Sequence, residues 1–232
     1  MVSGNFSKVQ KMIYFFSDSH FDTHCGANLY NQFPPELKTR TVFTENQWDI
    51  LEQGDWEHDC ELLILNMIGA TCDQPHAGAN AEAAIKRYTE RGGNILMLHG
   101  SSAAFWQWSW WRKLCGFRWV RPNDPDNVER SVHPVRTFTT YAAKSRHVLI
   151  EKLHEFTLAD DEIYIRCEQT LPMTVLMETH TDEGIYPQCV ECINPYGGKQ
   201  IIFLPGHKAE SFANKEFIAN NLVLIDYLLE NK

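Results

Sequence analysis

The sequence predicts an α/β fold, in which helices cover both faces of a mainly parallel sheet. Compact apolar runs of four to six residues recur along the chain, and such runs are typical of strands buried on both faces. Segments with helical spacing lie between them, and this alternation indicates parallel strands joined by helices. The chain has 232 residues, of which 44% are hydrophobic, and it contains no linker or repeat. We therefore expect one domain over residues 1–232.

In the first half of the chain, apolar runs predict strands over residues 11–16, 40–43, 62–67 and 95–98. Thr44 and Gln47 have the spacing of a capping box, so we expect a helix from there to about Gln53. Apolar residues at helical spacing predict another helix over residues 80–91, which the following glycine pair ends. The order of strands and helices is the one that a parallel sheet requires.

An aromatic-rich segment follows the fourth strand, and we expect it to be helical. On a helix, Phe105, Trp108 and Trp111 share one face, and Trp106 and Trp110 share another. One face is expected to pack on the sheet. The other is available to stack on a ligand or to form the interface of a homo-oligomer.

The rest of the chain is predicted to begin with a loop and to end in a helix. Residues 121–127 form the loop, and residues 132–156 mix short strands with connections. Strands are expected over residues 175–177, 188–193 and 200–204, and the turn at 194–198 pairs the last two as a hairpin. An amphipathic helix over residues 214–229 closes the chain.

Composition excludes several classes of partner. The net charge is -9 and no dense run of lysine or arginine occurs, which argues against nucleic acid and anionic membranes. No apolar run approaches the ~20 residues of a membrane span, and the first residues lack the pattern of a signal peptide. Seven scattered cysteines suit a reduced, cytoplasmic protein. Cys189 and Cys192 are expected on opposite faces of a strand, so they form neither a metal site nor a dithiol.

Polar residues that include histidine follow three predicted strands. They are residues 18–24 after the first strand, His99 after the fourth and His207 after the last, and residues 160–164 add two acids and a phenol. The carboxyl ends of parallel strands meet at one edge, so these groups are expected to converge. Imidazoles beside carboxylates serve either acid–base catalysis or metal binding. Taken singly, each residue could equally be an ordinary loop residue.

Three segments resemble the trehalose-utilisation (ThuA-like) family, within the class I glutamine-amidotransferase-like superfamily. Residues 92–102 resemble the family's glycine-rich "LHxxS" strand and turn, residues 147–164 its stretch ending in "DE-x-Y", and residues 198–207 its ending in "GH". The resemblance implies a flavodoxin-like three-layer sandwich and a role in carbohydrate metabolism, often on keto-type sugars. It also implies that His99 stands where a glutamine amidotransferase has its nucleophile. Amidotransferase activity is therefore not expected.

We therefore expect an enzyme that acts on a small-molecule carbohydrate by proton transfer. The catalytic candidates are His99, His207 and Glu162. Together with His20, these residues could instead hold a divalent metal such as zinc as a cofactor. The expected substrate-binding residues are Asp18, His20, Ser101, Ser102, Tyr164 and Trp106, with the neighbourhood of Trp119, Glu129 and Arg130 as a further source of polar contacts.

Two alternatives stay open at this point. One is a non-catalytic sugar-binding or regulatory module on the same fold, because a fold does not fix an activity. The other is a cysteine-type amidase or hydrolase in which Cys25 projects from a neighbouring loop.

Overall fold

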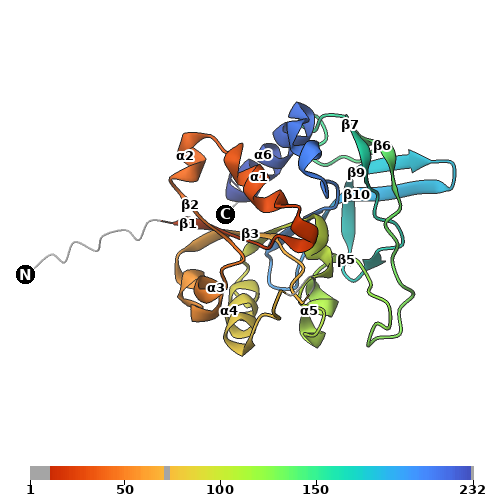
Figure 1. The fold of residues 1–232 in the computed structure, drawn as a ribbon. Coiled ribbons are helices and arrows are strands. Elements are labelled where there is room, and N and C mark those ends of the chain that lie inside the picture. The colour runs from red at the N-terminus through yellow and green to blue at the C-terminus, as the bar shows by residue number, and fades with distance from the viewer. Residues whose placement is uncertain (1–10, 71–73, 231–232) are drawn as a thin grey trace, which may run out of the picture.

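The computed structural model describes residues 11–70 and 74–230, which form a three-layer α/β sandwich (Figure 1). The middle layer is a nine-stranded sheet with the order β2-β1-β3-β4-β11-β10-β9-β6-β7. Its strands are β1 Met12–Ser17, β2 Thr41–Glu45, β3 Cys60–Asn66, β4 Asn94–Leu98, β6 Val135–Ala142, β7 Phe156–Glu162, β9 Met173–Thr181, β10 Gly184–Ile193 and β11 Lys199–Phe203. A second, two-stranded sheet joins β5 Phe117–Arg118 to β8 Glu168–Gln169.

Helices cover both faces of the sheet. α1 Cys25–Asn31, α2 Pro35–Lys38 and α6 Lys215–Glu230 lie on one side, and α3 Asp49–Gln53, α4 Ala79–Glu90 and α5 Ser109–Leu114 lie on the other (Figure 1). Short 3-10 helices complete the chain: η1 His20–Asp22, η2 Asp55–His58, η3 His99–Ala103 and η4 Ala209–Ala213. In the part of the chain that the structure describes, no helix is long and apolar enough to cross a membrane.

The strands from β2 to β11 in the sheet order form its parallel half. β1 pairs in parallel with β2 and β3, β3 with β4, and β4 with β11. Successive strand residues enter different cores: Phe15 packs on the side of α1 and α6, whereas Phe16 packs on the side of α3 and α4. Burial on both faces explains the continuous apolar runs, and the predicted parallel arrangement of these strands is confirmed.

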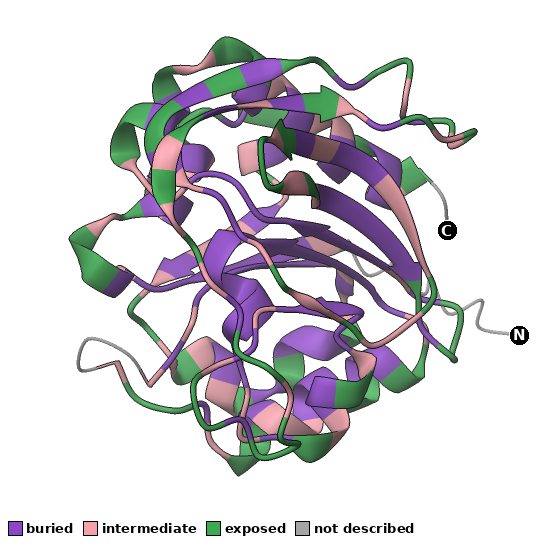
Figure 2. Cartoon of the chain, turned by 90° about the vertical axis from the view of Figure 1, so that its right-hand side faces the viewer, coloured by how far each residue is buried: buried purple, intermediate pink, exposed green. Residues whose placement is uncertain are grey.

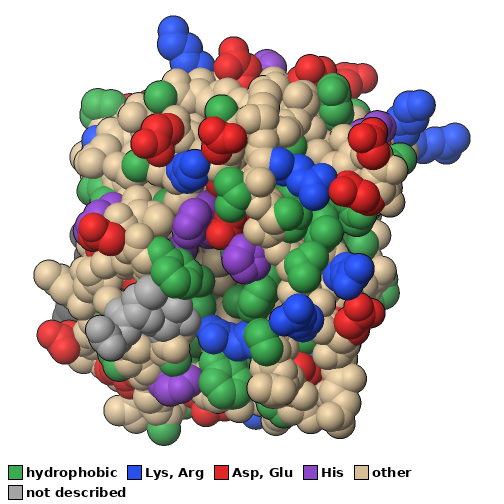
Figure 3. Space-filling model, turned by 45° about the vertical axis from the view of Figure 1, so that its right-hand side comes forward, with side chains coloured by type: hydrophobic (Ala, Val, Ile, Leu, Met, Phe, Trp, Pro, Cys, Tyr) green, Lys and Arg blue, Asp and Glu red, His purple; other side chains and the backbone are tan. Residues whose placement is uncertain are grey.

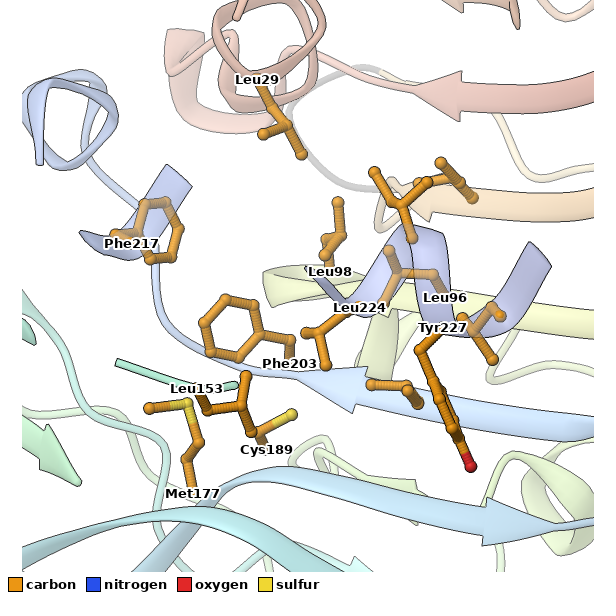
Figure 4. Close-up of a cluster of buried hydrophobic side chains, with 14 of the residues drawn as sticks. Leu29, Leu96, Leu98, Leu153, Met177, Cys189, Phe203, Phe217, Leu224 and Tyr227 are labelled. Carbon is orange, nitrogen blue, oxygen red and sulfur yellow. The ribbon is translucent and has the colours of Figure 1, made fainter. Parts of the chain in front are cut away.

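Two hydrophobic cores hold the layers together. Figure 4 shows the core under α1 and α6, where Leu29 and Leu224 point toward Leu98 and Phe203 of the sheet. The central strands are almost wholly buried, while the outward faces of the helices are exposed (Figure 2). Cys189 belongs to this first core and Cys192 to the opposite one, so the prediction that the two cysteines face apart is confirmed.

The other half of the sheet is antiparallel. The predicted hairpin joins β10 to β11, and β9, β6 and β7 extend the sheet from β10 in antiparallel pairings. The sequence indicated only mixed short strands in the region of β6 and β7. These strands bury alternate residues, which gives a weaker pattern than the apolar runs of the parallel half.

Two local predictions were wrong. Thr44 does not cap a helix: it lies in β2 opposite Phe16, and α3 starts only after Trp48, without a side-chain cap. Strand pairing has overridden the local capping signal at this point.

The aromatic segment is not one helix either, because Phe105 has a left-handed φ of 53° and α5 begins at Ser109. This backbone turn lets the rings of Phe105 and Trp108 stack, with centroids 4.3 Å apart.

Candidate functional site

A cavity of about 210 Å³ opens at the carboxyl edge of the parallel strands. On the face seen in Figure 3, histidine and acidic side chains gather beside hydrophobic ones at a hollow in the surface. The cavity is lined by His20, Phe21, Ile68, His99, Ala103, Trp119, Arg121, His133, Glu162, Tyr164 and His207. The structure thus brings together five of the residues that the sequence singled out: His20, His99, Glu162, Tyr164 and His207.

His99 occupies a constrained turn directly after β4. Its φ is 45°, a left-handed conformation that is uncommon outside glycine. The Nδ1–H group donates to the carbonyl of Leu204 at 2.9 Å, so the Nε2 lone pair of the neutral ring faces the cavity. Burial, reinforced by the neighbouring histidines, lowers the pKa of His99 to about 3 despite the opposing effect of Glu162. The ring is therefore an uncharged acceptor at neutral pH.

His20 is held in the same way by an acidic partner. Its Nδ1–H group donates to Oδ1 of Asp18 at 2.6 Å, and both side chains are buried. The second oxygen of Asp18 accepts the backbone N–H groups of Ile68 and Gly69, at 3.0 and 2.8 Å. The Nε2 atom of His20 is buried and has no hydrogen-bond partner among the described residues. A buried polar atom in this state indicates a missing ligand or water.

His207 closes the cluster from the loop after β11. Its Nδ1 atom lies 3.0 Å from Nε2 of His99, and its backbone N–H donates to Oδ1 of Asp161 at 3.0 Å. The preceding Gly206 has a φ of 106°, and a Cβ there would lie 2.6 Å from the ring of Phe217. Only glycine fits this turn without displacing the ring. Burial lowers the pKa of His207, so this imidazole is also neutral at neutral pH.

Glu162, at the end of β7, supplies the carboxylate of the cavity. One oxygen lies 3.0 Å from Nδ1 of His133, and the other lies 3.6 Å from Nε2 of His99 and 3.8 Å from Nδ1 of His207. Burial alone would raise the pKa of Glu162, but the hydrogen bond from His133 and the nearby imidazoles outweigh it and lower the pKa. That same hydrogen bond raises the pKa of His133.

Tyr164 adds a neutral phenol to this group. Its hydroxyl lies 3.4 Å from Nε2 of His99, and burial, together with the charge of Glu162, raises its pKa well above the ordinary value. The phenol therefore stays protonated and can donate a hydrogen bond to an oxygen in the cavity.

The three histidines fit a metal site. His20, His99 and His207 each offer one ring nitrogen, and these nitrogens all lie within 4.8 Å of one another. Metal-bound imidazoles commonly donate their other N–H to a carboxylate or a backbone carbonyl, as His20 does to Asp18 and His99 does to Leu204. Together with the unpartnered Nε2 of His20, this donor set suits zinc or a similar divalent ion.

Four residues expected to contact substrate do not line the cavity. Asp18 uses both oxygens for His20 and the backbone, and Ser101 accepts the backbone N–H of Met67 through its hydroxyl. Ser102 donates to the carbonyl of His99. Trp106 packs against Arg121, with 5.4 Å between the guanidinium carbon and the ring centroid, and does not itself line the cavity. These side chains support the lining residues instead.

Sequence reasoning missed several lining residues, namely Phe21, Ile68, Arg121 and His133. Arg121 and His133 come from the connection between the small sheet and β6, which carries no periodic signal. Of the neighbourhood suggested near Trp119, only Trp119 itself reaches the cavity, since Glu129 and Arg130 are exposed. The one available signal was a histidine directly before Pro134 in an otherwise irregular segment.

Cys25 does not have the properties of a nucleophile. The side chain is buried, and its thiol donates to the carbonyl of His207 at 2.9 Å. Burial raises its pKa to about 12, so the thiolate that nucleophilic attack requires is not formed at neutral pH.

Comparisons with known proteins agree with this architecture. The chain matches the family model ThuA, described as trehalose utilisation, over residues 23–223, whereas no curated protein matches. A ThuA-like protein from Bacteroides uniformis ATCC 8492 is similar in structure, with a TM-score of 0.68 and 13% identity, covering 100% of this chain and 97% of that chain. A second one, from Parabacteroides merdae ATCC 43184, has a TM-score of 0.63 and 12% identity, with coverages of 91% and 88%.

A more distant likeness concerns the fold. A protein from Thermoplasma acidophilum, described as belonging to a GMP synthase, has a TM-score of 0.50 and 11% identity, and the match covers 96% of each chain. At such identities the likeness concerns the fold alone, which is the flavodoxin-like sandwich of the class I glutamine amidotransferases. Since the family model spans most of the sequence, the chain belongs to the ThuA family of trehalose utilisation, and this membership supports a role in carbohydrate metabolism.

Proposed function

We propose that the protein is an enzyme that moves a proton beside the carbonyl of a keto-sugar, with a divalent metal ion held by His20, His99 and His207. The observation that carries this proposal is the group of three imidazoles, whose ring nitrogens lie within 4.8 Å of one another in a cavity that also contains a carboxylate. Membership of the family supports a carbohydrate as the substrate. The side chains that line the cavity support proton transfer as the reaction.

The metal has one task in this proposal. When bound, a zinc-like ion acts as a Lewis acid on a sugar oxygen. The histidines are ready to hold it because His99 and His207 have lowered pKa values and are neutral at neutral pH. Asp18 positions His20 through the 2.6 Å hydrogen bond between the two side chains.

The proton transfer falls to residues of the chain itself. Glu162 is ionised at neutral pH and takes the C–H proton next to the carbonyl, as a general base. His133 lies 3.0 Å from Glu162, and its hydrogen bond orients the carboxylate and stabilises its negative charge. The protonated phenol of Tyr164 donates a hydrogen bond to the oxygen on which negative charge develops.

Glutamine amidotransferase chemistry is not part of the proposal. Acyl transfer on this fold needs a thiolate at the turn after the central strand, and that turn carries His99. We further propose that the protein works in the cytoplasm. Two structurally similar proteins, from Salmonella typhimurium, are described as cytoplasmic.

Calorimetric titration of the metal-free protein with Zn²⁺ and Mn²⁺ tests the metal site. We expect one ion per chain, and at least a hundredfold weaker binding in His99→Ala. The matched control is His180→Ala, which removes an exposed histidine on β9 that pairs with Glu178 away from the cavity. Unchanged affinity in His99→Ala would overturn the metal site.

Deuterium exchange next to the carbonyl of a 3-keto-glycoside, followed by NMR in D₂O, tests the reaction. Glu162→Gln should slow exchange by about 10²–10⁴-fold, the range typical of general bases. The control Glu178→Gln, on β9, should leave the rate unchanged. Tight sugar binding without any exchange in the wild type would instead support the non-catalytic sugar-binding module.

A further inference from the structure

We infer that the cavity accepts a sugar with an anionic group, a carboxylate or a phosphoryl group, and that Arg121 binds this group. The inference deepens the proposed function and rests on it for the sugar part of the ligand. Its starting point is that Arg121 lines the same cavity as the three histidines and Glu162.

Arg121 has no acidic partner among the described residues. Its Nε and Nη2 atoms are buried and make no hydrogen bond within the part of the chain that the structure describes, and no salt bridge reaches the side chain there. The carboxylate in the cavity, that of Glu162, is already shared among His133, His99 and His207. A guanidinium keeps its charge even when burial lowers its pKa, as it does for Arg121. Its charge is therefore uncompensated.

The guanidinium is nevertheless held firmly in place. Its central carbon lies 5.4 Å from the ring centroid of Trp106, a distance typical of a cation–π contact. The backbone directly before it is anchored as well: Val120 exchanges hydrogen bonds with Ser131, and the N–H of Trp119 donates to the carbonyl of Ser102. A fixed and unpaired guanidinium is the arrangement that binds planar anions through two parallel hydrogen bonds.

Further donors in the cavity point to the same ligand class. The indole N–H of Trp119 is buried and has no acceptor among the described residues, and the pKa of His133 is raised by its hydrogen bond to Glu162. Hydroxyl groups of a neutral sugar could accept single hydrogen bonds from Arg121, but they would leave its charge uncompensated. A carboxylate or phosphoryl group compensates the charge and satisfies both free N–H groups.

The size of the cavity limits the ligand. Its volume of about 210 Å³ is below the roughly 300–1,000 Å³ of pockets that hold drug-sized molecules. We therefore expect a single sugar ring with its anionic substituent, such as a uronic acid or a sugar phosphate.

Calorimetry with matched sugars tests the inference on the full chain in 0.15 M NaCl. Glucuronate and glucose 6-phosphate are compared with glucose and with inorganic phosphate. We expect at least one of the two charged sugars to bind ten times more tightly than glucose. The charged sugar that binds more tightly shows whether the anionic group is a carboxylate or a phosphoryl group. In Arg121→Met, which keeps the length of the side chain beside Trp106, that advantage should disappear. The affinity for glucose should change much less than the affinity for the charged sugar.

Arg136→Met is the control, because Arg136 lies on β6 and pairs with Glu183 at the surface. Thermal melting of both variants verifies the fold. Charged sugars that bind no better than glucose, or that bind equally well to Arg121→Met, would overturn the inference.

The test of anion binding by Arg121 can fail or succeed independently of the test of the proposed function. If charged sugars bind through Arg121 but no keto-sugar exchanges deuterium, the proposed function fails and this inference stands. If keto-sugars exchange at a rate that depends neither on an anionic group nor on Arg121, this inference fails and the proposed function stands.

Discussion

Two arginines three residues apart, Arg118 and Arg121, stand in opposite electrostatic situations. Arg118 is buried and donates to Asp124 at 2.6 and 3.1 Å, and it also pairs with Glu168 and approaches Asp126. Arg121 faces the cavity and packs on the ring of Trp106, and it makes no hydrogen bond or ion pair with the described residues. A charge that is matched inside the protein serves the fold, whereas a held but unmatched charge implies a ligand.

The histidines likewise differ in whether their hydrogen-bonding groups have partners inside the protein. On β10, Glu191 binds His147 at 3.1 Å and the hydroxyl of Tyr227 at 2.8 Å, so this cluster is satisfied internally. In the cavity, Nε2 of His20 is buried without a described partner. The difference separates a structural polar cluster from a binding site more clearly than burial does, because both clusters are buried.

The largest effect is expected on the matched side of the comparison. Arg118→Ala would leave Asp124 as an uncompensated buried charge, and we expect a loss of about 3–5 kcal/mol in the free energy of unfolding. Urea denaturation measures it. The control Arg166→Ala breaks an exposed pair with Glu129 and should cost about 1 kcal/mol or less. Equal losses in the two variants would contradict the distinction.

Acid should remove part of the same stabilisation. Burial alone would raise the pKa of Asp124, but hydrogen bonds from Arg118 and from the backbone of Asp126 outweigh it and lower the pKa. The contribution is therefore complete above the unfolded value of about 3.9 and is lost as the pH falls through the folded value. Urea unfolding at several pH values should give a difference between wild type and Asp124→Asn that is constant near neutrality. The difference should narrow below about pH 4.

On the cavity side, Asp18→Asn should weaken metal binding by about 10–100-fold, because the residue that orients His20 and fixes its tautomer is changed. Calorimetry with Zn²⁺ measures the dissociation constant. Asp22→Asn, at an exposed position nearby, serves as the control. An unchanged metal affinity in a folded Asp18→Asn protein would show that Asp18 has no positioning role.

His147→Ala should affect stability and leave metal binding alone. Removing the imidazole takes away its hydrogen bonds with Glu191 and Tyr227, and we expect a loss of about 1–2 kcal/mol in the free energy of unfolding. The affinity for Zn²⁺ should match that of the wild type. A weaker metal affinity would mean that the two histidine clusters are coupled, which the comparison does not allow.

The smallest change in stability is expected for Arg121→Met. No described hydrogen bond or ion pair is lost, the methionine side chain still packs beside Trp106, and an uncompensated charge is removed, so the free energy of unfolding should stay within about 0.5 kcal/mol or rise. Chemical denaturation checks this. A loss as large as that of Arg118→Ala would mean that Arg121 has a structural partner, and the contrast between the two arginines would fail.

Local sequence was enough to predict the parallel half of the sheet and the histidines at its edge. Apolar runs such as residues 62–67 and 95–98 are local signals, and β3 and β4 lie where those runs predict them. The polar residues that follow these strands could be predicted as candidate site residues, because they directly follow the apolar runs in the sequence. His20, His99 and His207 converge because parallel strands end at one edge of a sheet.

Long-range packing, in contrast, determines what those residues can do. Thr44 belongs to a strand because it pairs with β1, which no local capping signal records. The roles of Asp18, Arg121 and His133 depend on partners far away in the chain or on the lack of them. The tautomer of His99 is likewise set by its hydrogen bond to Leu204, 105 residues away. Hydrogen bonds across such separations form only when the layers pack, so the chemistry of the cavity is a property of the fold.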